Sequence, residues 1–409
     1  MSDGSQPLPD SQVAPVDVSF VLPCLNEARS LAACIGAIGE AQAAIQSTYG
    51  LSSEIVVADN GSTDGSQALA ERLGARVIAV AQKGYGAALS GGFRAAHGRY
   101  LVMGDADGSY DFREAVAMVG ALVDGADMCM GSRFAGGIKP GAMPWKNRYI
   151  GNPLLTGILN LLFRVGVTDA HCGLRALTKA SFDRLQLTGS GMEFASEMVI
   201  KAALKGERIV ERPATLSPDL RDRAPHLRPW RDGWRHLRYL FMLSPAWLFA
   251  LPGVAAVITG AFILTVAGAH FLVARREMFF FGNYWDVLAG ALVGLGHVAI
   301  ILALASHVHG VRAGYRRPMP WFVALSRWVT LETMILAGLA LAIFGFGDLA
   351  WVLAEWSAGV LTRIDSVLPV VIGALLMTLG GQTILGGFLL AIIGGNEAKF
   401  MDAPAGRHG

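Results

Sequence analysis

Two aspartates stand one residue apart at the end of a short apolar segment. The segment is 100–103, and Asp105 and Asp107 follow it. Residues i and i+2 of an extended chain point the same way, so the two carboxylates can face one point in space. They repel each other there unless a cation lies between them, and Mg²⁺ takes oxygen ligands that usually include substrate phosphates. The spacing indicates a metal–phosphate site. The plain alternative is that Asp105 opens a turn and Asp107 caps the next helix.

The elements that would position this pair alternate along the first half of the chain. Apolar segments with the composition of strands occur at 17–22, 54–58, 76–80, 100–103 and 127–130, and helical stretches separate them. Such alternation predicts a mostly parallel sheet with helices on both faces. Ligands bind these sheets beyond the carboxyl ends of the strands. Polar pairs follow four of the ends: Asn26/Glu27, Asp59/Asn60, Asp105/Asp107 and Ser132/Arg133. We therefore expect the edge of a binding cleft.

Gly84 and Gly86 could suggest other kinds of nucleotide site. A dinucleotide fingerprint needs a third glycine three residues after the second, where this chain has Leu89. No P-loop motif occurs in the sequence either. The glycines are therefore interpreted as a tight turn, either beside a phosphate or simply between a strand and a helix. A net charge of +2 gives no indication of a nucleic-acid partner.

Four motifs resemble, in their order, those of family 2 glycosyltransferases with the GT-A fold. They are VSFVLPCLNE at 18–27, ADNGSTDGS at 58–66, KGYGAALSGGF at 83–93 and GDAD at 104–107. The resemblance covers about 17–243. It is closest to the polyprenyl-phosphate branch, which includes dolichyl-phosphate mannose and glucose synthases. It implies a Rossmann-like α/β catalytic domain. That branch often has two aspartates where this chain has Asp59 and Asn60, so the nucleobase is left unassigned.

The resemblance also implies a donor site. Nucleotide contacts are expected at Pro23, Asn26, Glu27, Asp59, Lys83, Gly84, Asp105, Ala106 and Asp107. Asp105 and Asp107 would hold the donor diphosphate through Mg²⁺ or Mn²⁺. The leaving group is then a nucleoside diphosphate, and a bound divalent ion stabilises the charge that develops on it.

The cations expected around the acceptor follow the fifth strand. Arginine can bind phosphate through two parallel hydrogen bonds. The resemblance places Arg133 and a basic residue near Arg148 at the acceptor phosphate. It places Asp169, Arg175 and Glu193 near the donor sugar and diphosphate. Arg221 and Arg223, in a proline-flanked loop, complete the expected catalytic set. Each arginine could instead be a solvated surface charge.

His171 is a candidate general base, but the expected chemistry has little need of one. The second pKa of a phosphate monoester is about 6, so a lipid phosphate is already anionic near neutral pH. Such a reaction needs positioning and leaving-group stabilisation more than proton abstraction.

A basic amphipathic helix, predicted over 227–243, precedes the long apolar segments. Trp230, Trp234, Leu237 and Phe241 share a helical stripe, with arginines between them. This pattern is typical of a helix in a membrane interface, although a packed surface helix would also fit it. Segments long enough to span a bilayer lie at about 246–273, 286–308, 321–345 and 367–394. Within these spans, His297 and Glu332 are expected to hydrogen-bond neighbouring helices.

The segments divide the chain into a disordered leader (1–16), a GT-A domain (17–226), the amphipathic helix (227–243), an all-α transmembrane domain (244–395) and a tail (396–409). The cysteines show no paired spacing and indicate reduced thiols. Arginines within 311–320 and before the first span predict, by the positive-inside rule, a cytoplasmic catalytic domain. The predicted location is the inner or plasma membrane.

The predicted function is inverting transfer of a hexose from a nucleotide sugar to a membrane polyprenyl phosphate. UDP-glucose is the favoured donor and GDP-mannose the next, and a homo-oligomer is compatible with this function. One alternative is a processive polysaccharide synthase, which would be expected to carry Q-x-x-R-W, but 205–243 contains no glutamine. Another is a non-catalytic nucleotide-sugar-binding scaffold, against which the presence of both aspartates argues.

Overall fold

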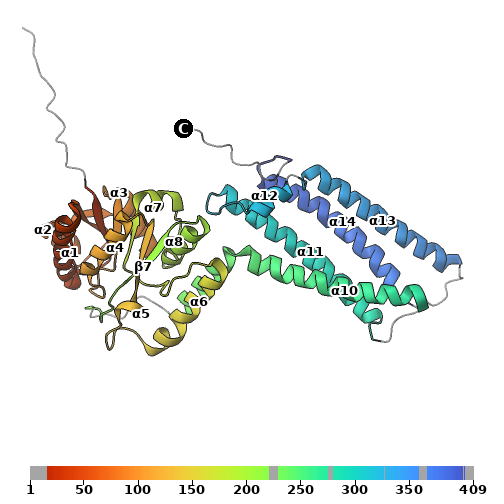
Figure 1. The fold of residues 1–409 in the computed structure, drawn as a ribbon, viewed down its shortest axis with the longest axis horizontal. Helices are drawn as coiled ribbons and strands as arrows, with labels where there is room; N and C mark the ends of the chain where they lie inside the picture. Colours follow the sequence, from red (N-terminus) through yellow and green to blue (C-terminus); the bar gives the residue numbers. More distant parts are fainter. Residues whose placement is uncertain are drawn as a thin grey trace, which may run out of the picture. The chain divides into compact units, whose positions relative to one another are not determined.

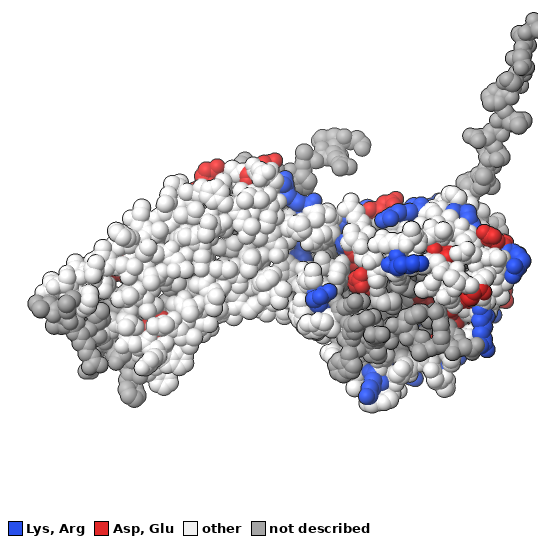
Figure 2. Space-filling model, turned by 180° about the vertical axis from the view of Figure 1, so that it is seen from behind, with Lys and Arg blue, Asp and Glu red and all other residues white. Residues whose placement is uncertain are grey.

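The computed structural model describes residues 16–220, 229–274, 280–326, 328–358, 366–398 and 400. Arg221 and Arg223 lie outside the described residues, as do nearly all of the predicted leader and most of the predicted tail. The chain forms two compact units, 1–239 and 240–409. On the face shown in Figure 2, charged side chains gather on the first unit and few lie on the second.

The first unit is built on a seven-stranded sheet with the order β3-β2-β1-β4-β6-β5-β7. The strands are β1 (Val18–Cys24), β2 (Ser53–Asp59), β3 (Arg76–Ala79), β4 (Tyr100–Met103), β5 (Met128–Ser132), β6 (Arg175–Thr178) and β7 (Ile209–Pro213). Only β6 runs antiparallel to its neighbours. The prediction of a mostly parallel α/β sheet is confirmed. β6 and β7 are additional to the five predicted strands.

The antiparallel strand β6 determines which loops meet at the carboxyl edge of the sheet. Its first residue, Arg175, is in register with Met103, the last residue of β4, and with Met130 of β5. The loop that enters β6 therefore opens at the same edge as the loops that leave β4 and β5. This arrangement brings 168–174 beside Asp105.

Helices cover both faces of the sheet (Figure 1). They are α1 (Ala28–Tyr49), α2 (Ser66–Arg72), α3 (Tyr85–Ala95), η1 (Phe112–Glu114), α4 (Ala115–Val123), α5 (Arg133–Gly136), η2 (Asn147–Gly151), α6 (Asn152–Phe163), α7 (Lys179–Leu185) and α8 (Glu193–Leu204). Side chains of a strand alternate between faces. Phe20 of β1 packs with α1 and α4 in the main core, whereas Val21 faces α3. The packed core thus fixes the positions of the strands, and the strands in turn fix the starting points of the loops at their carboxyl ends.

The second unit is helical. Its elements are η3 (Ala246–Ala250), α10 (Leu251–Ala274), α11 (Asn283–Arg312), α12 (Pro320–Ser326), α13 (Leu331–Ala358) and α14 (Leu368–Ile393), and α9 (Pro229–Met242) runs across the boundary between the units. Within the described ranges, four helices are long and apolar enough to cross a membrane: Ala246–Val273, Asn283–Arg312, Leu331–Ala358 and Leu368–Ile393. The chain is a multi-pass membrane protein.

The predicted third span, 321–345, is wrong in position. The short α12 occupies its start, and the spanning helix α13 begins at Leu331. Thr330 and Thr333 exchange reciprocal hydrogen bonds between their hydroxyl oxygens and backbone N–H groups, which starts a new helix at this point. The helix then continues past Asp348 because the residues up to Trp356 are mostly apolar.

Polar and small residues join the spanning helices. His297 Nδ1 lies 3.0 Å from Gln382 Oε1 of α14, which confirms the predicted interhelical hydrogen bond. Glu332 does not make such a bond, because it is exposed in the first turn of α13. A Cβ on Gly338 would lie 2.7 Å from the Gly380 carbonyl oxygen, so glycine permits α13 and α14 to approach closely.

Candidate active site

Asp105 and Asp107 follow β4 at the carboxyl edge of the sheet, as predicted. The Tyr85 hydroxyl at the start of α3 donates to Asp105 Oδ1 at 2.9 Å. The Ser109 backbone N–H donates to Asp107 Oδ1 at 2.9 Å. Gly173 packs against Asp105, since a Cβ there would stand 2.7 Å from Asp105 Oδ2. Contacts from three segments therefore fix the carboxylates, and the missing side chain of Gly173 permits the close approach of its loop to Asp105.

The pair fits a hard divalent ion that shares its coordination with a ligand. Across the described ranges, no group of three or more His, Cys, Asp or Glu side chains could hold a metal by itself. A two-carboxylate site leaves the remaining positions to phosphate oxygens and water, as is usual for Mg²⁺. The local field is negative: burial, and then the charges of Asp107, Asp105 and Glu27, raise the pKa of the Cys34 thiol to about 12.

Asp59 shapes the loop after β2. Its carboxylate accepts the Gly61 N–H at 2.9 Å, the Ser62 N–H at 3.1 Å and the Gln67 side-chain amide at 2.5 Å. Burial alone would raise the pKa of Asp59, but hydrogen bonds from Ser62, Gln67 and Gly61 bring it below its usual value. The side chain is ionised at neutral pH and organises the 61–67 loop. Its contact with a nucleoside stays a prediction.

The loop after β1 docks on the same segment. Asn26 has a left-handed backbone (φ 58°), donates its N–H to Ser62 Oγ at 2.9 Å and accepts the Thr63 N–H at 2.8 Å. The Glu27 N–H donates to Ser66 Oγ at 3.0 Å. The structure therefore brings together Asn26, Glu27 and Asp59, which sequence reasoning assigned to one nucleoside site.

Asn60 has a positioning role that sequence reasoning missed. Its side-chain nitrogen donates to the carbonyl oxygens of Val80 at 3.0 Å and Gln82 at 2.7 Å. Its side-chain oxygen accepts the Gly84 N–H at 2.8 Å, and Lys83 Nζ donates to its backbone oxygen at 2.5 Å. One amide thus ties the loop after β2 to the loop before α3. The amide donates two hydrogen bonds from its nitrogen and accepts one at its oxygen, whereas a carboxylate could only accept.

Replacing Asn60 with aspartate is expected to destabilise the catalytic unit by about 3 kcal/mol, because a carboxylate would face two carbonyl oxygens without a donor. For a unit of this size the loss corresponds to a fall in Tm of roughly 6–12 °C. Thermal unfolding of the purified full-length protein would measure it. Gln82→Ala is the matched control, since only the backbone of Gln82 is bonded. Equal Tm values for the two variants would contradict the role of Asn60.

Arg133 and Asp169 form a buried ion pair between the start of α5 and the loop that enters β6. Arg133 Nε and Nη2 donate to the two carboxylate oxygens at 2.6 and 2.7 Å, and the Arg133 N–H donates at 3.0 Å. The side chains are 9% and 0% exposed. Burial alone would raise the pKa of Asp169, but Arg133 brings it below its usual value. The resemblance assigned the two residues to different substrates, whereas the structure joins them in one pair.

Arg175 is fully buried and satisfied by backbone oxygens. It donates to the carbonyls of Cys172 at 2.8 Å, Ala195 at 2.5 Å and Ala170 at 2.9 Å. It therefore fixes the entry to β6 and the start of α8. This environment favours a positioning role over the predicted direct contact with the diphosphate.

The other predicted side chains have varied surroundings. Glu193 is half-buried and accepts the Gly191 N–H at 2.9 Å, at the first turn of α8. Arg148 is partly exposed, with its guanidinium 5.4 Å from the Tyr149 ring centre. The roles of both residues toward substrates stay predictions.

His171 lies in the 168–175 loop, 5.5 Å from His236 of α9 between ring centres. Burial, together with the neighbouring His236 and Arg133, lowers the pKa of His171 to about 3. The imidazole is neutral and weakly basic at neutral pH, which disfavours a general-base role.

Comparisons with known proteins identify related sequences over both units. The model named "Glycosyl transferase family 2" matches residues 19–186, and the model of a family 2 C-terminal transmembrane region matches 304–394. The low-salt glycan biosynthesis hexosyltransferase Agl6 of Haloferax volcanii is 36% identical over 391 residues, which cover 94% of this chain and 91% of the relative.

More distant relatives match about half of this chain. The dolichol-phosphate mannosyltransferase of Pyrococcus furiosus is 27% identical over 55% of this chain and 63% of its own. The polyprenol monophosphomannose synthase of Mycolicibacterium smegmatis is 29% identical over 48% and 76%. Among solved structures, a glucosyl-3-phosphoglycerate synthase from Mycobacterium tuberculosis matches with a TM-score of 0.40 and 22% identity, over 56% of this chain and 78% of that one.

Proposed function

The chain belongs to glycosyltransferase family 2, and on this basis we propose that it transfers one hexose from a nucleotide sugar to a polyprenyl phosphate in the membrane. The carboxylate pair Asp105 and Asp107 is the observation that carries the proposal, because it is suited to hold a metal-bound diphosphate. A hexosyltransferase relative supports the hexose. Relatives named for dolichol phosphate and polyprenol phosphate support the lipid acceptor.

In the proposed reaction an oxygen of the lipid phosphate attacks C1 of the hexose. The bond between C1 and the donor diphosphate breaks, the electron pair leaves with the nucleoside diphosphate, and the configuration at C1 inverts. Asp105 and Asp107 would hold Mg²⁺ or Mn²⁺, which stabilises the charge on the leaving group. The weakly basic His171 is not needed, because the attacking oxygen is already anionic.

The remaining residues position this chemistry. The loops held by Asp59 and Asn60 form the predicted nucleoside side of the site, with Pro23 and Lys83. The Arg133–Asp169 pair joins the start of α5 to the loop that enters β6, on the predicted acceptor side. We propose that the first unit faces the cytoplasm and that the chain resides in the inner or plasma membrane, as the arginine distribution indicates.

A donor panel would test the function. Purified full-length protein in lipid nanodiscs would be supplied with polyprenyl phosphate, Mn²⁺ and one nucleotide sugar at a time, while release of nucleoside diphosphate is measured. We expect release that depends on the acceptor lipid, fastest with UDP-glucose and next with GDP-mannose. Donor binding without release for every common nucleotide sugar would instead favour a non-catalytic scaffold.

A further inference from the structure

His307 and Arg316 of the second unit each carry a buried nitrogen atom without a hydrogen-bond partner among the described residues. His307 lies near the end of α11 and is 6% exposed, and the atom is its Nε2. Arg316 lies in the loop between α11 and α12, and the atom is its Nε. Native structures keep few buried polar groups of this kind, because each one loses its hydrogen bonds to water. Two of them close together therefore indicate a ligand.

The chain folds back after α11 and brings these side chains to the same end of the helix. The Arg316 N–H donates to the Gly310 carbonyl at 3.1 Å, and Gly310 lies less than one helical turn after His307. A Cβ on Gly310 would stand 3.0 Å from the Tyr315 ring, so the glycine permits this close return. The charge of Arg316 acts on the His307 imidazole. The guanidinium and the imidazole thus form one polar cluster.

The cluster offers hydrogen-bond donors to an anion and an apolar surface beside them. Arg316 uses Nη2 to bond the Leu243 carbonyl at 2.5 Å, and a guanidinium has five N–H donors in all. A neutral imidazole donates from one of its ring nitrogens. The His307 ring lies 5.0 Å from the Phe322 ring of α12 between centres, and Phe322 packs in an apolar cluster with Val308. This combination suits an anion that is attached to an apolar group.

The position of the cluster favours a lipid phosphate over a soluble anion. α11 is long and apolar enough to cross a membrane, and His307 lies five residues before its last residue, Arg312. The end of a spanning helix lies at the depth of the lipid headgroups. The segment 311–320 contains three arginines and no Asp or Glu. Arginine binds phosphate strongly, and basic pockets between spanning helices bind anionic headgroups. We propose that His307 and Arg316 form a binding site for the phosphate group of an anionic phospholipid.

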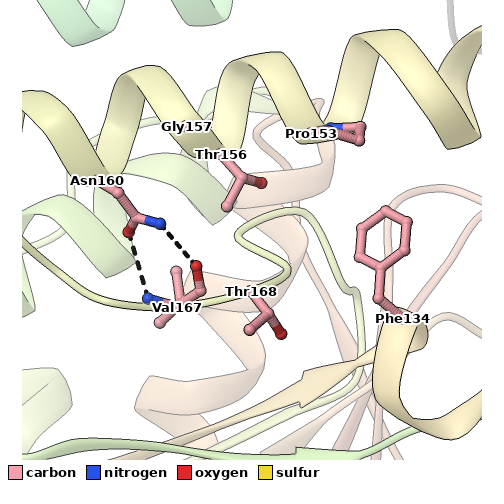
Figure 3. Close-up of a pocket in the computed structure, with 7 residues that line it drawn as sticks. All are labelled: Phe134, Pro153, Thr156, Gly157, Asn160, Val167 and Thr168. Carbon is pink, nitrogen blue, oxygen red and sulfur yellow. Dashed lines mark hydrogen bonds between the residues drawn. The ribbon is translucent and has the colours of Figure 1, made fainter.

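The groove of the first unit offers no comparable site for an anion. It holds about 340 Å³, and the residues that line it, such as Phe134 and Thr156, carry no charge (Figure 3). The Asn160 amide in its wall donates to the Val167 carbonyl at 2.7 Å and accepts the Gly166 and Val167 N–H groups at 3.0 and 3.2 Å. The phospholipid site in the second unit is therefore separate from this groove, and it does not depend on the proposed transfer reaction.

Native mass spectrometry of the purified full-length protein would test the site. Delipidated protein in detergent would be titrated with dioleoyl phosphatidylglycerol, with dioleoylglycerol, which has the same chains and no phosphate, and with polyprenyl phosphate. Arg316→Met removes the guanidinium, and His307→Phe keeps a ring against Phe322 but removes its nitrogens. Arg317→Met is the matched control, because Arg317 is the exposed neighbour of Arg316 in the same loop.

We expect phosphatidylglycerol to bind the unchanged protein more tightly than dioleoylglycerol does. Its dissociation constant should rise roughly tenfold or more in Arg316→Met, which loses hydrogen bonds from a charged donor, and about 2- to 10-fold in His307→Phe, which loses a neutral one. It should stay within about twofold in Arg317→Met, since exposed charges contribute little. Equal binding of phosphatidylglycerol and dioleoylglycerol, or equal losses in the Arg316 and Arg317 variants, would overturn the proposal. Binding of polyprenyl phosphate but not of phosphatidylglycerol would assign the cluster to the acceptor lipid and would also overturn it.

Thermal unfolding of the same variants separates a ligand site from a structural role. Without lipid, His307→Phe should have a Tm equal to or higher than that of the unchanged protein, because it removes an unpartnered nitrogen. Added phosphatidylglycerol should raise the Tm of the unchanged protein, because a ligand of the folded state stabilises it, and should leave that of Arg316→Met nearly constant. A lower Tm for lipid-free His307→Phe would show that the imidazole has a partner within the fold and would contradict the proposal.

Discussion

Replacing Asp107 with alanine is expected to lower sugar transfer by about a thousandfold or more, because removing one preorganised electrostatic stabiliser costs this much in other enzymes and the pair has only two carboxylates. The remaining Asp105 would hold a divalent ion and its diphosphate poorly. Turnover of purified full-length protein with saturating donor and lipid acceptor would measure the loss. Membrane insertion and expression should be unchanged, since Asp107 is a buried polar residue of the loop after β4 and no member of the apolar core.

Asp111→Ala provides the matched control for this loss. Asp111 lies four residues further along the same loop, where it caps η1 and pairs with Arg113. Its removal should cost about 1 kcal/mol of stability through the lost cap and leave turnover within a few-fold of the unchanged protein. Substantial turnover by the Asp107 variant, comparable with that of the Asp111 variant, would contradict the metal–diphosphate role of the pair.

Asp169→Asn is expected to destabilise the catalytic unit by about 3–5 kcal/mol, because it leaves the buried guanidinium of Arg133 without a counter-charge. At roughly 2–4 °C per kcal/mol, the Tm would fall by about 6–20 °C. The substitution preserves shape, so the effect reports on charge rather than on packing. The loss would be measured by thermal unfolding of the full-length protein, with nucleotide binding as the signal that reports unfolding of the first unit.

A double variant separates the structural role of this pair from a catalytic one. Arg133→Met together with Asp169→Leu replaces a buried ion pair by apolar side chains of similar volume, which is often neutral for stability. We expect the Tm to recover while transfer stays low. The KM for the lipid acceptor should change more than the KM for the nucleotide-sugar donor. Full recovery of transfer in the stable double variant would show that the pair only supports the fold.

Much of the candidate site could be predicted from local sequence because strand ends are local features. The apolar runs before Asp59 and Asp105 identified parallel strands, and parallel strands necessarily bring their carboxyl ends to one edge. The polar residues after these runs therefore pointed to the cleft. The four spanning helices could also be predicted locally, because the length and hydropathy of a segment are properties of consecutive residues.

The features that sequence reasoning missed depend on contacts between distant residues or on short signals. Arg133 and Asp169 are 36 positions apart, so neither spacing nor composition shows that they pair. The strand β6 has only four residues and follows a polar turn, too short for a period to be seen. The third span was placed too early because α12 ends at Ser326 and the hydroxyl caps at Thr330 and Thr333 start a new helix within an apolar region.

Product analysis is the measurement that tests the central claim most directly. Purified full-length protein would be incubated with UDP-glucose or GDP-mannose, Mn²⁺ and polyprenyl phosphate, and the organic-extractable lipid would be analysed by mass spectrometry and by nuclear magnetic resonance of the anomeric proton. The account predicts polyprenyl phosphate that carries one hexose, with the configuration at C1 opposite to that of the donor. A ladder of lipid-linked or free oligosaccharides, a retained configuration, or no sugar on the lipid with any common donor would contradict it.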